Sequence, residues 1–155
     1  LKYLEYGLKI HIKGGVSKLI SLLKSSFSLK KGKQVNIPEL AIFKNWEEVV
    51  EYSKTDHGKD LATLIKLVEK NNVYNLIQML TEISKNKESA ADITLSTAHK
   101  VKGCEYDKVM LAKDFKLKED KYYSDEEVRL LYVAITRASL ELDITECEAA
   151  KYFLT

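Results

Sequence analysis

One segment of the sequence is a polar, basic loop expected between two buried strands, at the sheet edge where α/β proteins bind ligands. It reads Thr97-Ala98-His99-Lys100-Val101-Lys102-Gly103-Cys104-Glu105-Tyr106-Asp107. The composition of this segment also fits a solvated connector, because polar loops lie on protein surfaces.

A second segment, residues 126–138, reads EEVRLLYVAITRA and ends on a guanidinium. Its middle is apolar on nearly all sides, which predicts a buried helix. Arg137 follows at the end of that helix. A cation there either complements the helix dipole or presents positive charge to a ligand, and the residue types alone leave both interpretations open.

The elements around these segments predict an α/β fold. Residues 93–96 and 108–112 are β-branched or apolar and predict two buried strands. Asp125 is the expected N-cap of the helix over 126–138, and residues 140–145 alternate as a strand. This order indicates a mostly parallel sheet covered by helices on both faces, with ligands at the carboxyl ends of its strands.

The first half of the sequence predicts one strand followed by helices. Residues 8–12 alternate as a half-buried strand, and Gly14-Gly15 ends it. Apolar residues then recur at helical spacing over residues 16–27. Three more helices are expected around residues 46–53, 61–69 and 73–83. Residues 16–92 are therefore expected to be mostly helical.

Together the two segments resemble motifs V and VI of superfamily 1 DNA helicases of the UvrD, Rep and PcrA type. Members carry T-x-H-x-x-K-G-L-E-F and then E-E-x-R-L-x-Y-V-A-x-T-R-A, and the strings here are TAHKVKGCEYD and EEVRLLYVAITRA. The glycine pair after the first strand is similar to motif IVa. Residues 16–92 are 77 positions, too few for the large 2B insertion of UvrD and PcrA, and this spacing resembles the F-box DNA helicase branch.

The resemblance implies a second motor domain with a RecA-like (P-loop NTPase-type) fold, called 2A, over residues 1–155, with residues 16–92 as a reduced helical insertion. Arg137 matches the catalytic arginine finger. Nucleotide contacts are also implied for Lys102, Gly103 and Glu105, and Glu105 matches the acceptor for the ribose hydroxyl. Single-stranded DNA contacts are implied for Gly14, Gly15, Thr97, His99 and Lys100. The implied activity is ATP hydrolysis coupled to 3′–5′ translocation and DNA unwinding.

The sequence contains no G-x-x-x-x-G-K-[ST] phosphate loop. Its two Gly-Lys pairs, at residues 32–33 and 58–59, are followed by Gln34 and Asp60. ATP and Mg²⁺ are therefore expected to bind mainly to an N-terminal RecA-like domain of the same polypeptide, and the chain alone is expected to be inactive. The cysteines and histidines lack metal-ligand spacing, so no metal site is predicted.

Composition excludes some classes of protein. The 155 residues are 45% apolar and 31% charged, which suits one globular domain. No apolar run approaches the roughly 20 residues that span a bilayer, and no signal-peptide pattern precedes residue 20. The net charge of +2 is unevenly distributed, because residues 1–44 hold nine lysines against two acids. Such a basic segment fits a phosphate backbone, but lysine-rich surfaces are also common, so charge alone does not identify a partner. A chain that begins at Leu1 is expected to be part of a longer cytoplasmic protein.

Two alternatives remain open at this stage. A RecA-like domain that has lost catalysis can serve as a module that binds DNA or a protein. The helicase part of a helicase-nuclease carries similar motifs. A phosphate loop upstream in the gene separates the first alternative from a motor domain, and a nuclease motif downstream identifies the second.

Overall fold

The computed structural model describes residues 6–115 and 124–154 and has a mixed α/β fold. The chain divides into two compact units, Leu1–Leu95 and Ser96–Thr155. Within the described residues, strands pair only in parallel, as two-stranded sheets. The α/β class with parallel strands that the sequence predicts is confirmed.

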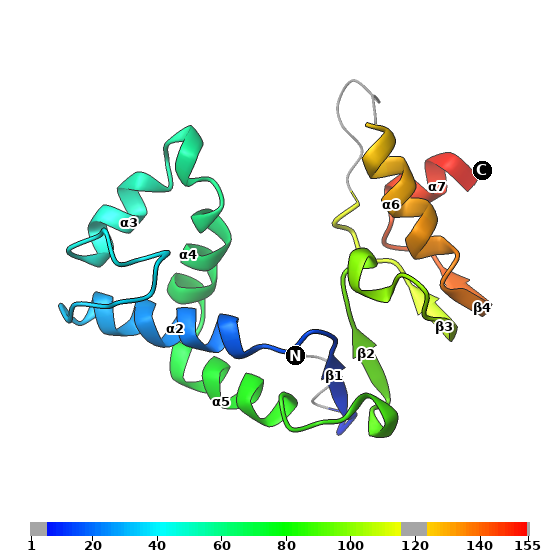
Figure 1. Ribbon diagram of the computed structural model, residues 1–155, viewed down its shortest axis with the longest axis horizontal. Helices are drawn as coiled ribbons and strands as arrows, with labels where there is room; N and C mark the ends of the chain where they lie inside the picture. The colour runs from blue at the N-terminus through cyan, green and yellow to red at the C-terminus, as the bar shows by residue number, and fades with distance from the viewer. Residues whose placement is uncertain (1–5, 116–123, 155) are drawn as a thin grey trace. The chain divides into compact units, whose positions relative to one another are not determined.

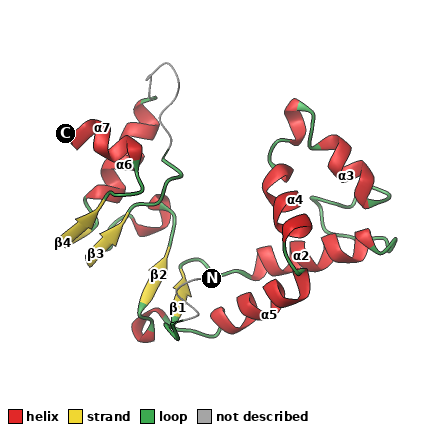
Figure 2. Ribbon diagram, turned by 180° about the vertical axis from the view of Figure 1, so that it is seen from behind, coloured by secondary structure: helices red, strands yellow, loops and turns green. Residues whose placement is uncertain are grey.

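The first unit is mostly helical (Figures 1 and 2). In chain order it contains β1 (Ile10–Ile12), α2 (Ser17–Lys30), α3 (Trp46–Tyr52), the 3-10 turn η1 (Asp56–Gly58), α4 (Leu61–Lys70), α5 (Val73–Ile83), the 3-10 turn η2 (Glu88–Ala90) and β2 (Ile93–Leu95). Helix α2 packs against α5, α4 and α3. The four predicted helices are confirmed, and α2 ends at Lys30, where a run of lysines and a glycine begins.

Local sequence explains where these helices begin and which faces they bury. The Asn45 side chain accepts a hydrogen bond from the Glu48 amide at the start of α3, and Asn72 accepts one from the Asn75 amide at the start of α5. The apolar stripes of the helices then meet in one core. Its fully buried members include Leu23, Leu29, Leu40 and Val49.

The two strands of the first unit bring the ends of the helical segment together. β1 pairs with β2 in parallel, with Ile10 beside Ile93 and Ile12 beside Leu95. Asn86 strengthens this junction, because its Nδ2 donates to the Ile10 carbonyl at 2.8 Å and its own carbonyl lies 2.8 Å from His11 Nδ1. The helices α2–α5 therefore form an insertion between two neighbouring strands.

The second unit is a strand–helix–strand arrangement with a closing helix (Figure 1). It contains the 3-10 turn η3 (Ala98–Val101), β3 (Tyr106–Met110), α6 (Asp125–Ile135), β4 (Ala138–Asp143) and α7 (Glu148–Leu154). β3 and β4 are parallel, as a crossover through a helix requires. The buried core of this unit consists of Leu111, Leu131, Ala134, Cys147, Ala149 and Ala150. Residues 116–123, which separate the two motifs in the sequence, lie outside the described residues.

Two expectations about this unit are wrong in detail. The N-cap of α6 is Ser124 rather than Asp125, because Ser124 and Glu127 form a reciprocal capping box that satisfies two main-chain amides. Helix α6 is not buried all round, since Tyr132 is 67% exposed. The helix packs one face on the core, and only Leu131 and Ala134 are buried.

The strands are also less buried than their apolar sequences predict. Met110 of β3 is 52% exposed and Leu95 of β2 is 47% exposed. A two-stranded sheet packed on one side leaves its other face open, whereas the continuous covered sheet expected from the sequence hides both faces. No helix in the described part of the chain is long and apolar enough to cross a membrane.

Candidate functional site

The motif V segment is held as a compact turn between β2 and β3. Thr97 is extended and precedes η3, where the Lys100 amide donates to the Thr97 carbonyl at 3.1 Å. Val101 is the buried residue of this turn, and η3 packs against α6. Because Val101 faces inward, the side chains of Thr97, His99 and Lys100 remain exposed.

Gly103 turns the chain from η3 into β3. Its φ is +82°, in the left-handed region that favours glycine, and a Cβ built there meets nothing within 4 Å. The requirement for glycine therefore concerns the main-chain conformation rather than space. The Cys104 amide donates to the Val101 carbonyl at 2.9 Å, which closes the turn and fixes the main chain of Cys104 ahead of Glu105.

Arg137 lies in the turn between α6 and β4 and joins motif VI to motif V. Its Nη1 donates to the Cys104 carbonyl at 2.8 Å, across 33 residues of sequence. Its Nε donates to the Val133 carbonyl at 2.9 Å, and its Nη2 donates to the Thr136 hydroxyl at 3.0 Å. The half-buried guanidinium is thus held by one turn of α6 and by the motif V main chain.

These bonds leave part of the guanidinium available. A guanidinium carries five N–H groups, and three of them are used in these three hydrogen bonds. Among the described residues, no further partner takes the one N–H that remains on each terminal nitrogen, and these two N–H groups suffice for a paired contact with two phosphate oxygens. Arg137 therefore satisfies the structural requirement of a helix end and still retains donors for a ligand.

Lys102 and Glu105 flank this contact and are exposed. Neither side chain makes a hydrogen bond or ion pair within the described residues, so both are free to meet a ligand. Motif V therefore carries an unpaired ammonium and an unpaired carboxylate on either side of the carbonyl that binds Arg137. The structure brings Lys102, Gly103, Glu105 and Arg137 together at this turn.

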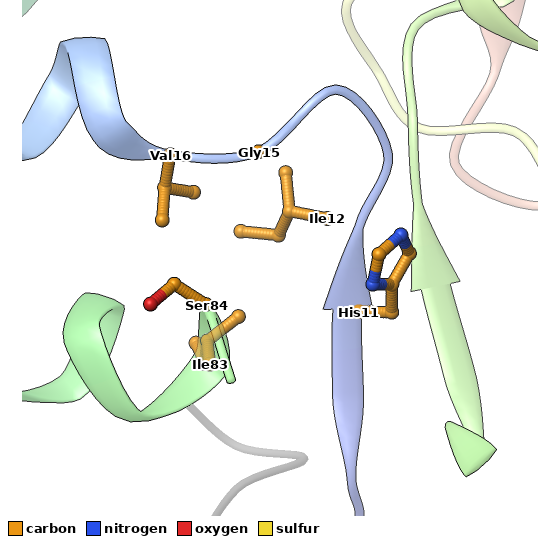
Figure 3. Close-up of a pocket in the computed structure, with 6 residues that line it drawn as sticks. All are labelled: His11, Ile12, Gly15, Val16, Ile83 and Ser84. Carbon is orange, nitrogen blue, oxygen red and sulfur yellow. The ribbon is translucent and has the colours of Figure 1, made fainter. Parts of the chain in front are cut away.

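Gly14 and Gly15 lie in the first unit, in the loop from β1 to α2. Both have positive φ, +88° and +73°, and both are exposed. The Gly15 amide donates to the Ile12 carbonyl at 2.9 Å. Gly15 also lines a small pocket of about 40 Å³ with His11, Ile12, Val16, Ile83 and Ser84 (Figure 3). The hydrogen bonds of Arg137 involve residues of the second unit alone.

Sequence reasoning missed the residues that hold Arg137. Two of its partners are main-chain oxygens, of Val133 and Cys104, and a main-chain acceptor leaves no trace in the residue type. The third partner is the hydroxyl of Thr136, the residue before Arg137 in the sequence. A Thr-Arg pair at the end of a predicted helix is the sequence signal for this contact.

Two other charged groups of the second unit have shifted pKa values because of nearby hydrogen bonds. Lys108 on β3 lies 2.6 Å from the Glu141 carboxylate on β4, and this hydrogen bond and charge raise the pKa of Lys108. Hydrogen bonds from Thr145 lower the pKa of the Asp143 carboxyl group. Among the described residues, no cluster of three His, Cys, Asp or Glu side chains is arranged to hold a metal ion.

Comparisons with known proteins show which family the chain resembles. A family model described as the UvrD-like helicase C-terminal domain matches residues 10–149. The chain is 30% identical over 153 residues to F-box DNA helicase protein 1 of Schizosaccharomyces pombe, an alignment that covers 88% of this chain and 17% of the relative. It is 29% identical over 161 residues to F-box DNA helicase 1 of Gallus gallus, covering 86% of this chain and 16% of that protein.

The chain thus spans less than a fifth of the length of each of these relatives. No solved structure matches it significantly. The family model covers both motifs, the glycine pair and the helical insertion between β1 and β2. The protein belongs to the UvrD-like helicase C-terminal domain family.

Proposed function

We propose that this chain is the second motor domain, 2A, of an ATP-dependent DNA helicase that translocates 3′ to 5′. The observation that carries the proposal is the bond from Arg137 to the Cys104 carbonyl, which places a guanidinium with two remaining N–H groups beside motif V. In this proposal both units belong to one motor domain over residues 1–155, and residues 16–92 are its reduced insertion.

The nucleotide side of the proposal uses four residues. Arg137 stabilises charge that develops on the γ-phosphate, and Lys102 adds positive charge near the phosphates. Glu105 accepts hydrogen bonds from the ribose diol, and Gly103 gives the turn the main-chain path that presents Glu105. These exposed, unpaired groups fit a nucleotide. Mg²⁺ and most of the ATP contacts belong to the N-terminal RecA-like domain of the same polypeptide.

The DNA side of the proposal uses the first part of the motif V turn. Thr97, His99 and Lys100 are exposed and contact the single-stranded DNA backbone, and the main chain at Gly14 and Gly15 makes a close approach to a phosphate. Both ligands then contact the same short turn. Movement of Arg137 toward nucleotide therefore acts on the DNA-binding residues through the Cys104 main chain.

The test is Arg137→Ala in the full-length protein that contains this chain. We expect the rate of DNA-stimulated ATP hydrolysis to fall by about 10³- to 10⁵-fold, with a much smaller change in ATP affinity, because a finger acts on transition-state charge. Lys108→Ala, which removes an exposed cation of the same unit, is the matched control and should leave the rate unchanged.

Turnover of Arg137→Ala within a few-fold of the parent would contradict the proposal. Arg137 would then serve only to join the end of α6 to motif V. The melting temperature of each variant is measured first, so that a loss of rate is not a loss of fold.

A further inference from the structure

Thr136 contributes the side-chain oxygen in the set of atoms that hold Arg137. It is the C-cap residue of α6 and is half-buried. Its Oγ1 lies 2.9 Å from the Tyr132 carbonyl and 3.2 Å from the Val133 carbonyl, and it lies 3.0 Å from Arg137 Nη2. The hydroxyl therefore sits between the last turn of α6 and the guanidinium.

The direction of each hydrogen bond follows from chemistry. A guanidinium only donates, so the Thr136 oxygen must accept from Arg137 Nη2. The hydroxyl has a single proton, which it donates to one of the two carbonyls of α6. That donation fixes the rotation of the hydroxyl and turns its lone pairs away from the helix, toward the guanidinium. The hydrogen bonds thus run from Arg137 through Thr136 to α6.

We propose that Thr136 is a positioning residue for Arg137, an inference that rests on the proposed function. The carbonyls of Val133 and Cys104 fix Nε and Nη1, and the Thr136 hydroxyl fixes Nη2. With all three nitrogens held, the planar guanidinium has one orientation, and so do its two remaining N–H groups. Loss of the hydroxyl leaves Arg137 Nη2 without this acceptor but does not change the charge of the guanidinium.

The experiment compares Thr136→Val with Thr136→Ser in the full-length protein. Valine keeps the branched shape but has no acceptor, whereas serine keeps the hydroxyl. We expect Thr136→Val to lower kcat for DNA-stimulated ATP hydrolysis by about ten-fold or more, with the KM for ATP changed less than about two-fold, because one hydrogen bond to a charged group is lost. Thr136→Ser should retain kcat within about three-fold of the parent.

A matched control is available in the first unit. The Thr81 hydroxyl on α5 donates to the Ile77 carbonyl at 2.7 Å, the same bond to the preceding helical turn but without a guanidinium beside it. Thr81→Val should leave kcat unchanged. If Thr136→Val lowers the melting temperature by much more than Thr81→Val, Thr136→Ala provides the second variant without a hydroxyl.

The double variant Thr136→Val with Arg137→Ala completes the test. It should be no slower than Arg137→Ala alone, since Thr136 acts through Arg137. Equal kcat for Thr136→Val and the parent, failure of serine to rescue, or a further loss in the double variant each overturns the positioning role. If Arg137→Ala itself retains the parental rate, the proposed function fails, and this result is distinct from failure of the Thr136 inference alone.

Discussion

At the scale of single residues, the motif V turn carries a histidine before its buried residue and a carboxylate after its glycine. His99 is exposed on η3, ahead of the buried Val101. Glu105 follows Gly103 and adjoins the carbonyl that receives the Arg137 bond. In the proposed function, the DNA contact at His99 and the nucleotide contact at Glu105 therefore lie only a few residues apart on the same turn.

This arrangement predicts separable effects of His99→Ala and Glu105→Ala. We expect His99→Ala to reduce mainly the stimulation of ATP hydrolysis by single-stranded DNA. Glu105→Ala should instead raise the KM for ATP about ten-fold or more, because a hydrogen bond to a charged acceptor is lost. Steady-state titrations of ATP and DNA with the full-length protein measure both quantities.

Asp114→Ala removes an exposed carboxylate of the same unit and serves as the control for Glu105→Ala. If His99→Ala and Glu105→Ala change the two quantities in equal proportion, the assignment of separate ligands to the two sides of the turn is wrong. The motif V segment would then be a basic connector.

At the scale of elements, the helices of the insertion depend on a few close contacts. Gly58 in η1 is buried against the end of α3. A Cβ at residue 58 would lie 2.6 Å from the Tyr52 carbonyl carbon and 2.8 Å from Ser53 Cα, and even closer to the Tyr52 oxygen. All three are main-chain atoms, so no side-chain rotation relieves the overlap.

Gly58→Ala is therefore expected to lower the free energy of unfolding by about 1–3 kcal/mol, the usual cost of an overpacked site. Urea denaturation followed by circular dichroism measures the change. Asp60→Ala, an exposed neighbour that makes no side-chain cap bond, should change the free energy by less than about 0.5 kcal/mol. Equal stability of Gly58→Ala and the parent would show that α3 and η1 move apart freely.

Glu69 links three helices of the insertion through one carboxylate oxygen. Lys30 Nζ from α2 lies 3.0 Å from Glu69 Oε1, and Trp46 Nε1 from α3 donates to the same oxygen at 2.7 Å. These hydrogen bonds, first from Lys30 and then from Trp46, lower the pKa of Glu69 below its ordinary value of 4.5. The ionised carboxylate is thus favoured in the folded state.

The sign of the resulting pH dependence follows from linkage. A lowered carboxyl pKa contributes stability above pH 4.5, and this contribution is lost as the pH falls through the folded-state pKa. The free energy of unfolding should therefore fall less for Glu69→Gln than for the parent as the pH is lowered from 5 to 3. Trp46→Phe, which removes the Nε1 donor, should weaken the pH dependence in the same direction. Parallel stability curves for Glu69→Gln and the parent would contradict this role.

At the scale of the whole molecule, both recognisable motifs belong to the unit Ser96–Thr155, and the insertion belongs to the unit Leu1–Leu95. Each unit has its own buried core. The sequence contains no phosphate loop, so in the proposed function this chain contributes Arg137 and Lys102 to the contacts with the triphosphate. Such groups stabilise transferred charge but do not enclose the phosphates as a phosphate loop does.

We therefore predict that the purified 155-residue chain does not hydrolyse ATP, with or without single-stranded DNA. A coupled ATPase assay measures the rate, and the Arg137→Ala chain provides the background of contaminating ATPase. DNA-stimulated turnover above that background would show that this chain holds a complete catalytic site.

The sequence by itself determined the helices, the α/β order and the resemblance to a helicase family. Helical periodicity and caps such as Asn45 and Asn72 are local properties, since their partners lie within a few residues. α5 therefore has the bounds that periodicity predicts. The motif strings are likewise read directly from residue order. The Ser124–Glu127 capping box is local in the same way, because its two partners are three residues apart.

Only the tertiary structure decided which atoms hold Arg137 and which apolar faces are buried. The Cys104 carbonyl reaches Arg137 because the parallel pairing of β3 and β4 brings Tyr106 beside Ala138, the residues that follow Cys104–Glu105 and Arg137. Main-chain acceptors are the same at every position, so residue types do not reveal this contact. Burial of a strand or of α6 depends on which other elements pack against each of its faces. The local periodicity of the sequence carries no information about those elements.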